Sequence, residues 1–145
     1  MYREILTYPI NTVQIREELA FFVQHFQSLN YGFCDVLFGS AWGNDYYPGD
    51  EWQIVRLPLA DLLKEVSRVE AANLGKLGSD DLFVQLPNLD LEFRFCNDCD
   101  IHIEFQEPSE ITEFFYQRWK RLGFTPAEYS RIEKDSTESE RLREN

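Results

Sequence analysis

The chain has few positive charges for its size. Fourteen lysines and arginines stand against 26 aspartates and glutamates, which leaves a net charge of −12. Such a surface repels the backbone of nucleic acids and anionic lipid headgroups, so we expect neither as a partner. A basic protein would be attracted instead, although the same charge also serves simply to keep a domain soluble.

Long apolar stretches and a full set of disulfide partners are also missing. No apolar run approaches the roughly 18 residues that can span a bilayer, and the first nine residues contain no signal-peptide core. Three cysteines, an odd number, fit reduced thiols better than a secreted disulfide framework. We therefore expect a cytoplasmic protein.

The common motifs of nucleotide-binding proteins, hydrolases and metalloproteases do not occur in the chain. It contains no GxGxxG, P-loop, GxSxG or HExxH. A Cys-His or Ser-His mechanism would have to use His25 or His102, and neither has an evident nucleophile and orienting group in the sequence. An enzyme is therefore the minority hypothesis, and no catalytic residue is assigned.

The apolar content that is present suits one packed domain. Apolar residues make up 43% and aromatic residues 15% of the 145 positions, which excludes a wholly disordered chain. We assign residues 1–132 to a single α+β domain. Residues 133–145 have almost no apolar content and mixed charge, which predicts a flexible tail.

The periodicity of the apolar residues predicts the order of helices and strands. Helices are expected where apolar residues recur every three or four positions, at 13–29, 58–73 and 109–122. Strands are expected at 33–38, 52–55, 81–86, 89–96 and 100–106, with a short helical turn ending at 132. The predicted order is α-β-β-α-β-β-β-α, in which an antiparallel sheet of four or five strands has helices packed on one face.

The segment from 89 to 105 is the most regular part of the sequence and predicts a β-hairpin. Its odd-numbered residues are apolar in both strands, so one face belongs to the core and the other is polar. Opposite residues of antiparallel strands share a face, so the register that keeps apolar residues together joins residues whose numbers sum to 196. This register places Cys96 opposite Asp100 and does not pair Cys96 with Cys99.

The polar side of this hairpin is the first candidate site. Cys96 and Cys99 form a CxxC motif, which occurs in redox dithiols and as half of a zinc site. Asp100, His102 and Glu104 alternate along the second strand, so they project to one side. These five residues form a candidate site for zinc or another divalent metal.

Other features of the sequence favour a plain solvated face. Any exposed antiparallel hairpin has alternating polar residues, and Arg94 opposite His102 puts a cation where a metal would lie. A closed zinc site needs four ligands, and outside this hairpin the chain has no second CxxC or CxxH. The main expectation is therefore a protein without a cofactor.

The second candidate site is the loop that follows residue 39. It sets large aromatic side chains among turn residues and carboxylates, a composition typical of binding loops. An alternative is that the aromatic side chains fold back onto the core as a lid. The predicted partner-binding residues are Trp42, Asp45, Tyr46, Tyr47, Asp50 and Glu51.

These observations favour a non-enzymatic protein-binding module. The small, acidic, loop-bearing build is similar to that of many inhibitor or immunity-type proteins, a resemblance of build that assigns no residues. It implies that an acidic surface recognises a basic protein. The alternatives are a metal-binding site or metal-dependent enzyme on the hairpin at 89–105, and a small-ligand pocket under the aromatic helix at 109–122.

Overall fold

A computed structural model describes residues 2–39 and 54–131 of this chain. Seven strands form one sheet with the order β3-β2-β4-β5-β6-β1-β7, and every neighbouring pair is antiparallel. The strands are β1 (Tyr2–Leu6), β2 (Phe33–Phe38), β3 (Val55–Pro58), β4 (Leu82–Gln85), β5 (Leu91–Phe95), β6 (Ile101–Phe105) and β7 (Ala127–Arg131). The helices are α1 (Thr12–Ser28), the short 3-10 helix η1 (Leu59–Asp61), α3 (Leu62–Ala71) and α4 (Glu110–Arg121).

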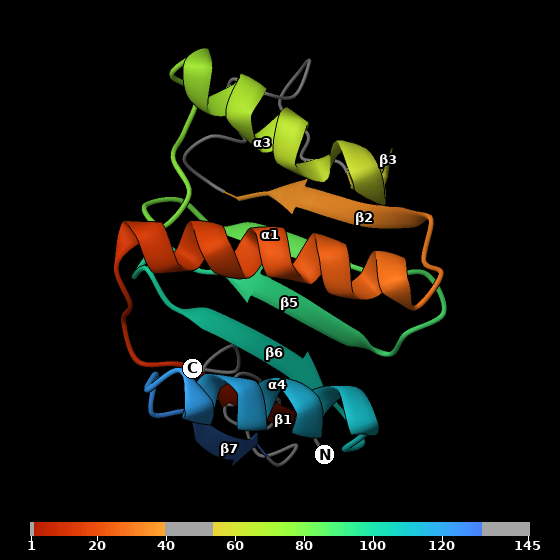
Figure 1. Ribbon diagram of the computed structural model, residues 1–145, viewed down its shortest axis with the longest axis vertical. Helices are drawn as coiled ribbons and strands as arrows, with labels where there is room; N and C mark the ends of the chain where they lie inside the picture. The colour runs from red at the N-terminus through yellow and green to blue at the C-terminus, as the bar shows by residue number, and fades with distance from the viewer. Residues whose placement is uncertain (1, 40–53, 132–145) are drawn as a thin grey trace, which may run out of the picture.

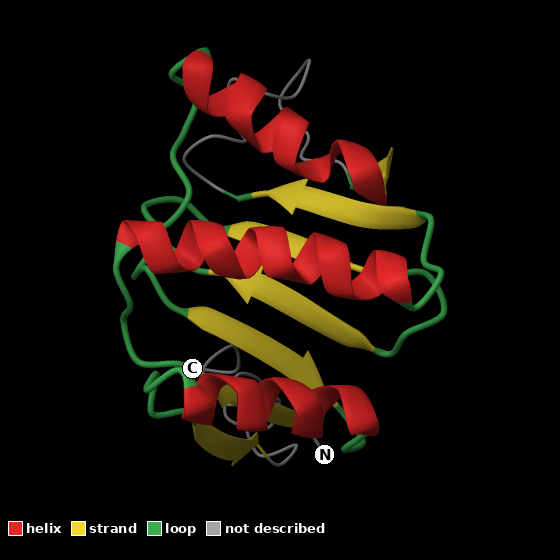
Figure 2. Ribbon diagram, viewed as in Figure 1, coloured by secondary structure: helices red, strands yellow, loops and turns green. Residues whose placement is uncertain are grey.

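The three α-helices lie on the same side of the sheet (Figures 1 and 2). Helix α1 crosses the centre of the sheet, α3 lies beside β2 and β3, and α4 lies in front of β1. The core forms between these layers, where both Phe22 of α1 and Phe115 of α4 pack edge-on against Phe93 of β5. The opposite face of the sheet is not covered by any described helix.

The sequence predicted the mixed class and the antiparallel sheet, but the predicted strand number is wrong. The sheet has seven strands, and the two that the sequence did not predict, β1 and β7, lie at one end of it. The segment before residue 132 forms strand β7 instead of the expected helical turn. Neither strand has the alternating pattern of a half-buried strand. In β1 the acidic Glu4 is buried and the apolar Leu6 lies on the uncovered face. Strand β7 is short and pairs only with β1, at the edge of the sheet. The predicted tail at 133–145 lies outside the described residues, and the extent of the single domain stays a prediction.

The predicted start of the first helix and the predicted hairpin register are confirmed. Asn11 and Gln14 form the expected capping box, in which the Asn11 side chain accepts from the Gln14 amide at 2.8 Å. In the hairpin, Leu91 pairs with Phe105 and Phe95 with Ile101, so the paired numbers sum to 196. The next pair in this register is Cys96 and Asp100, whose backbone amide and carbonyl lie 2.8 Å apart.

A buried carboxylate joins α1 to α4. Glu18 is only 4% exposed, and its two oxygens accept hydrogen bonds from Arg118 at 3.1 and 2.6 Å. The indole nitrogen of Trp119 also donates to Glu18, at 3.1 Å. A buried carboxylate is tolerated only when such donors replace its hydration, so this contact fixes how the two helices pack.

Replacement of Glu18 by Gln should destabilise the protein strongly. The variant leaves the Arg118 guanidinium without its ionic partner in a largely buried position, which should lower the free energy of unfolding by about 3 kcal/mol. Urea denaturation measures this value. The matched control is Glu17→Gln, the same change on an exposed position of the same helix, for which a change within about 0.5 kcal/mol is expected. Equal effects of both substitutions would contradict this role of Glu18.

Candidate functional site

The candidate site lies on the uncovered face of the sheet. The odd-numbered residues of β5 and β6 are buried in the core, so their even-numbered neighbours point to the opposite face. Strand β1 pairs with β6 and adds Glu4 to this face. Two rows of adjacent side chains result across β5, β6 and β1: Glu92, Glu104 and Glu4 in one row, and Arg94, His102 and Leu6 in the next.

His102 is the centre of a network of charged side chains. Its Nδ1 forms a hydrogen bond with a carboxylate oxygen of Glu4, and its Nε2 lies 3.0 Å from Oδ1 of Asp100. Both carboxylates are buried, with 4% of Glu4 and 7% of Asp100 exposed. Arg94 lies on the Glu4 side, where its Nη2 is 3.7 Å from the same Glu4 oxygen. The network therefore joins three neighbouring strands.

This network keeps His102 charged. Burial by itself would lower the pKa of His102, but hydrogen bonds to Asp100, Cys96 and Glu4 outweigh burial and raise the pKa to about 11. Burial likewise opposes ionisation of Asp100, yet its hydrogen bond with His102 holds the pKa below the usual value. At neutral pH the unit is an imidazolium between two carboxylates.

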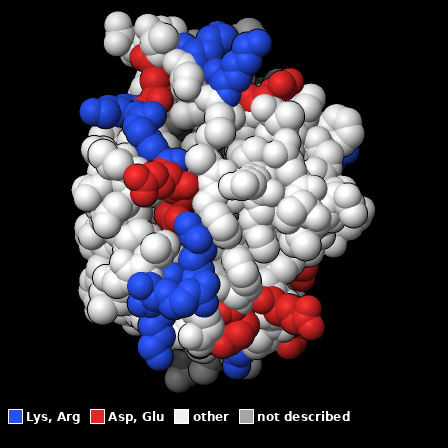
Figure 3. Space-filling model, viewed as in Figure 1, with Lys and Arg blue, Asp and Glu red and all other residues white. Residues whose placement is uncertain are grey.

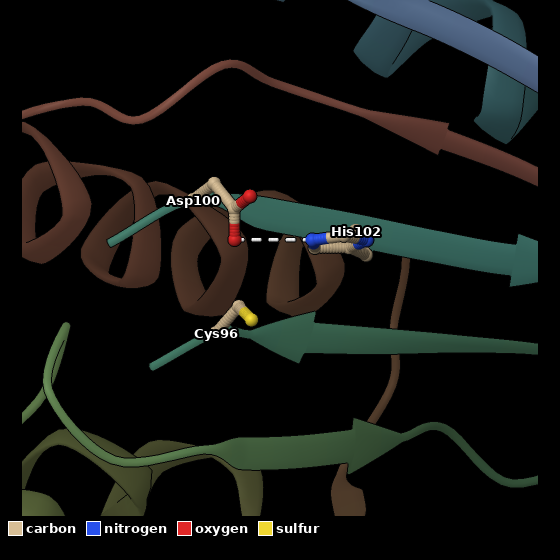
Figure 4. A group of neighbouring side chains, drawn as sticks. All are labelled: Cys96, Asp100 and His102. Carbon is tan, nitrogen blue, oxygen red and sulfur yellow. Dashed lines mark hydrogen bonds and ion pairs between the residues drawn. The ribbon is translucent and has the colours of Figure 1, made fainter. Parts of the chain in front are cut away.

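Cys96 completes a group of three potential metal ligands at the end of the hairpin. One ligand atom each from Cys96, Asp100 and His102 lies within 4.8 Å of the other two. Figure 4 shows the Cys96 side chain at the end of the strand next to the Asp100–His102 hydrogen bond. The three side chains come from adjacent ends of β5 and β6 and supply sulfur, oxygen and nitrogen, the donor types that bind zinc.

The same atoms also resemble a thiol-imidazole-carboxylate relay, with Cys96 as nucleophile, His102 as base and Glu4 as the orienting group. Two contacts argue against that chemistry. The Cys96 amide donates to the Asp100 carbonyl and so is not free to stabilise an oxyanion, and Asp100 already occupies the Nε2 position of His102. Cys96 is also only 6% exposed, which restricts the approach of a substrate.

Two of the five predicted metal ligands lie apart from this group. The Cys99 side chain packs against the core beside Gly78, on the other side of the hairpin turn from the cluster. Glu104 shares the uncovered face with His102 but lies one pair further along, opposite Glu92. The structure thus brings together three of the five: Cys96, Asp100 and His102.

Sequence reasoning missed Glu4, which binds the imidazole of His102. Its strand, β1, was not predicted, and 98 positions separate the two residues in the chain. The only available signal was a single acidic residue before Ile5-Leu6, which is too common to indicate a partner. The pairing of β1 with β6 is therefore what reveals the contact.

A second feature of the uncovered face is a pair of neighbouring carboxylates. Glu92 and Glu104 lie opposite each other and are both half-buried. Within the described part of the chain, no residue forms a hydrogen bond or ion pair with either carboxylate. Burial and the neighbouring Glu104 raise the pKa of Glu92, and together they outweigh the opposite effect of the Arg94 charge. A cavity of about 400 Å³ opens over the pair, lined also by Tyr2, Gln85 and Gln106.

The covered side of the molecule has a different charge pattern. Figure 3 shows lysine and arginine side chains gathered at one end of α4 and acidic side chains at its other end. The last turn of α4 holds Arg118, Lys120 and Arg121, and its first turn holds Glu110 and Glu113. This arrangement complements the helix dipole and needs no partner to explain it.

The loop predicted to bind a partner cannot be placed on either face. All six residues proposed for it (Trp42, Asp45, Tyr46, Tyr47, Asp50 and Glu51) lie outside the described residues. Their role stays a prediction from the sequence.

Replacement of Glu92 by Gln should stabilise the protein at neutral pH. A carboxyl group whose pKa is raised in the folded state favours folding only while it is protonated, below its ordinary value of 4.5, and that contribution is lost as the pH rises. The amide of glutamine carries no charge at any of these pH values, so the variant does not lose stability as the pH rises. The melting temperature of Glu92→Gln should therefore exceed that of the unmodified protein at pH 7, and the gain should shrink toward pH 4.

The control for this experiment is Glu107→Gln, because Glu107 is exposed in the turn after β6. It should change the melting temperature little at either pH. A Glu92→Gln variant that is less stable than the unmodified protein at pH 7 would show that the Glu92 charge is compensated in the folded state.

Comparison of the chain with protein-family models, with curated proteins and with solved structures found no match. No helix in the described ranges has the length and apolar content to cross a membrane. The function must therefore be argued from the geometry of the uncovered face.

Proposed function

We propose that this protein is a non-enzymatic binding module that docks a basic protein on the uncovered face of its sheet. The observation that carries the proposal is the pair of half-buried carboxylates, Glu92 and Glu104, which repel each other and have no positively charged group in hydrogen-bond or ion-pair contact among the described residues, although the nearby Arg94 partly offsets the rise in the pKa of Glu92. An arginine or lysine side chain placed between them would supply that charge. Arginine suits the position well because its guanidinium donates several hydrogen bonds in one plane.

The surroundings of this pair favour a protein partner. The cavity above it is also lined by Gln85 and Gln106, whose amide groups can bind the polar groups of an incoming chain. Large apolar side chains are exposed on the same face in β2 and β7: Phe33 is 52% and Tyr129 is 51% exposed. Apolar side chains beside charged ones are typical of the interfaces between proteins.

The overall charge supports the same partner. A net charge of −12 steers a basic protein toward the molecule over distances of about 10 Å, within which salt does not screen it fully. The resemblance of build to inhibitor or immunity-type proteins agrees with such a role. A cytoplasmic location belongs to this proposal as an expectation from the sequence.

A displayed library of random peptides tests which chemistry the face recognises. Peptides selected on the immobilised protein should be rich in arginine and lysine, and their binding should weaken steeply between 50 and about 500 mM salt. For one selected peptide, the dissociation constant should rise at least about tenfold on Glu92→Gln/Glu104→Gln, the equivalent of one lost charged contact. Replacement of its arginine by the neutral isostere citrulline should have a similar effect.

Stability separates lost binding from lost folding in this test. Glu92→Gln is expected to be more stable than the unmodified protein at pH 7, so weaker binding by this single variant cannot be attributed to unfolding. Glu17→Gln and Glu107→Gln remove the same charge from exposed positions elsewhere and should retain most of the affinity. The proposal fails if the selected peptides are not basic, or if they bind the double variant as tightly as the unmodified protein.

A further inference from the structure

We infer that Cys96, Asp100 and His102 form a binding site for a transition-metal dication, with zinc as the best fit, and that Glu4 positions the histidine for it. This inference is independent of the proposed protein-binding face, because it uses a different set of side chains. It rests on the convergence of three ligand atoms, on the hydrogen bond between Glu4 and Nδ1 of His102, and on the hydrogen bonds that hold the end of the hairpin.

The nitrogen and oxygen of the three ligand atoms are separated by nearly the distance found in a metal site, and the sulfur lies within reach of both. His102 Nε2 and Asp100 Oδ1 lie 3.0 Å apart, and all three ligand atoms lie within 4.8 Å of one another. Tetrahedral zinc with bonds of about 2.1 Å to nitrogen and oxygen holds such atoms about 3.4 Å apart, and a thiolate slightly further. The nitrogen and the oxygen would therefore have to move apart by a few tenths of an ångström, and the Cys96 side chain would adjust to bring its sulfur to the ion.

Glu4 supplies the contact that zinc-binding histidines have behind the ring. Its carboxylate accepts the hydrogen bond from Nδ1 of His102, which leaves Nε2 directed at Asp100. A carboxylate in this position fixes the ring and makes the opposite nitrogen a better ligand. Glu4 is thus a positioning residue and not a ligand.

Arg94 does not occupy the metal position, contrary to what its place opposite His102 suggested. Its Nη2 lies 3.2 Å from Nδ1 of His102 and 3.7 Å from Glu4, so the guanidinium is on the Nδ1 side of the ring. The ligand atoms converge on the Nε2 side. The cation and the metal position are therefore on different sides of the imidazole.

The backbone around the ligands is held in place. The amide of Cys96 bonds to the carbonyl of Asp100 at 2.8 Å, and Thr7 bonds to Ile101 through both its amide and its hydroxyl, each at 3.0 Å. The ligands themselves are buried or nearly so, with only 12% of the His102 side chain exposed. A preformed, enclosed set of ligands loses little conformational freedom when an ion binds.

The donor set selects the metal. Sulfur, imidazole nitrogen and one carboxylate oxygen suit zinc, whereas calcium and magnesium require mainly oxygen ligands. The ion would replace the proton on Nε2 of His102 and the thiol proton of Cys96, and both protons would be released to water. Three protein ligands leave the fourth position of the ion for a water molecule.

Cobalt(II) is the spectroscopic probe for this site and zinc the competing ion. The purified protein, freed of metal by a chelator, should bind one equivalent of Co²⁺ with a thiolate-to-cobalt absorption band in the near ultraviolet. One equivalent of Zn²⁺ should abolish the band, and zinc should raise the melting temperature.

Variants assign the ligands. Cys96→Ser should lose the near-ultraviolet band and the thermal shift by zinc, whereas Cys99→Ser, the matched control from the same turn, should retain both. Asp100→Asn and His102→Gln should weaken zinc binding strongly. Glu4→Gln should retain the thiolate band at saturating cobalt while the affinity falls roughly 10- to 100-fold, which is the behaviour of a positioning residue.

Two results would overturn the inference. One is the absence of a stoichiometric cobalt complex and of a zinc-induced thermal shift in the unmodified protein, a measurement that does not depend on any variant folding. The other is a thiolate band that survives in Cys96→Ser. Neither result bears on peptide binding by Glu92 and Glu104, so the two proposals fail separately.

Discussion

The pairing register of β5 with β6 is the constraint on which the rest of the structure depends. Side chains alternate along a strand, so a shift of one residue would exchange the two faces. Phe93 and Ile103 would then meet solvent, and Glu92, Arg94 and His102 would be forced under the helices. The observed register keeps all apolar residues of both strands beneath α1 and α4 and assigns the charged ones to the uncovered face.

The buried carboxylates of this fold differ in how they are compensated. Glu18 has an arginine and an indole as donors, and Glu4 and Asp100 share the imidazolium of His102. Each of these groups ties together elements that are distant in the sequence. The half-buried pair of Glu92 and Glu104 forms no hydrogen bond or ion pair in the described part of the chain, and Arg94 offsets the charge of Glu92 only in part. A local violation of charge pairing in an otherwise consistent structure is the usual mark of a functional surface.

His102 connects the two features of the uncovered face. Its Nδ1 side faces Glu4 and Arg94, next to a cavity of about 320 Å³ that Tyr129 and Ser130 also line. Its Nε2 side faces Asp100 and Cys96 at the end of the hairpin. The acidic pair of Glu92 and Glu104 lies in the adjacent row of side chains. A metal at the hairpin end would therefore lie on the same face as the proposed partner, without sharing a ligand with it.

The sequence by itself determined the mixed class, the three α-helices, the central hairpin and its register, because each depends on local periodicity and capping. The Asn11–Gln14 capping box and the opposition of Cys96 and Asp100 are examples. The tertiary structure alone decided the full width of the sheet. Strands β1 and β7 are formed by pairing at the far end of the sheet and not by an alternating pattern of their own. It also decided that Glu4 is the partner of His102. The two residues are 98 positions apart, so their contact depends on the pairing of distant strands and not on any local sequence pattern.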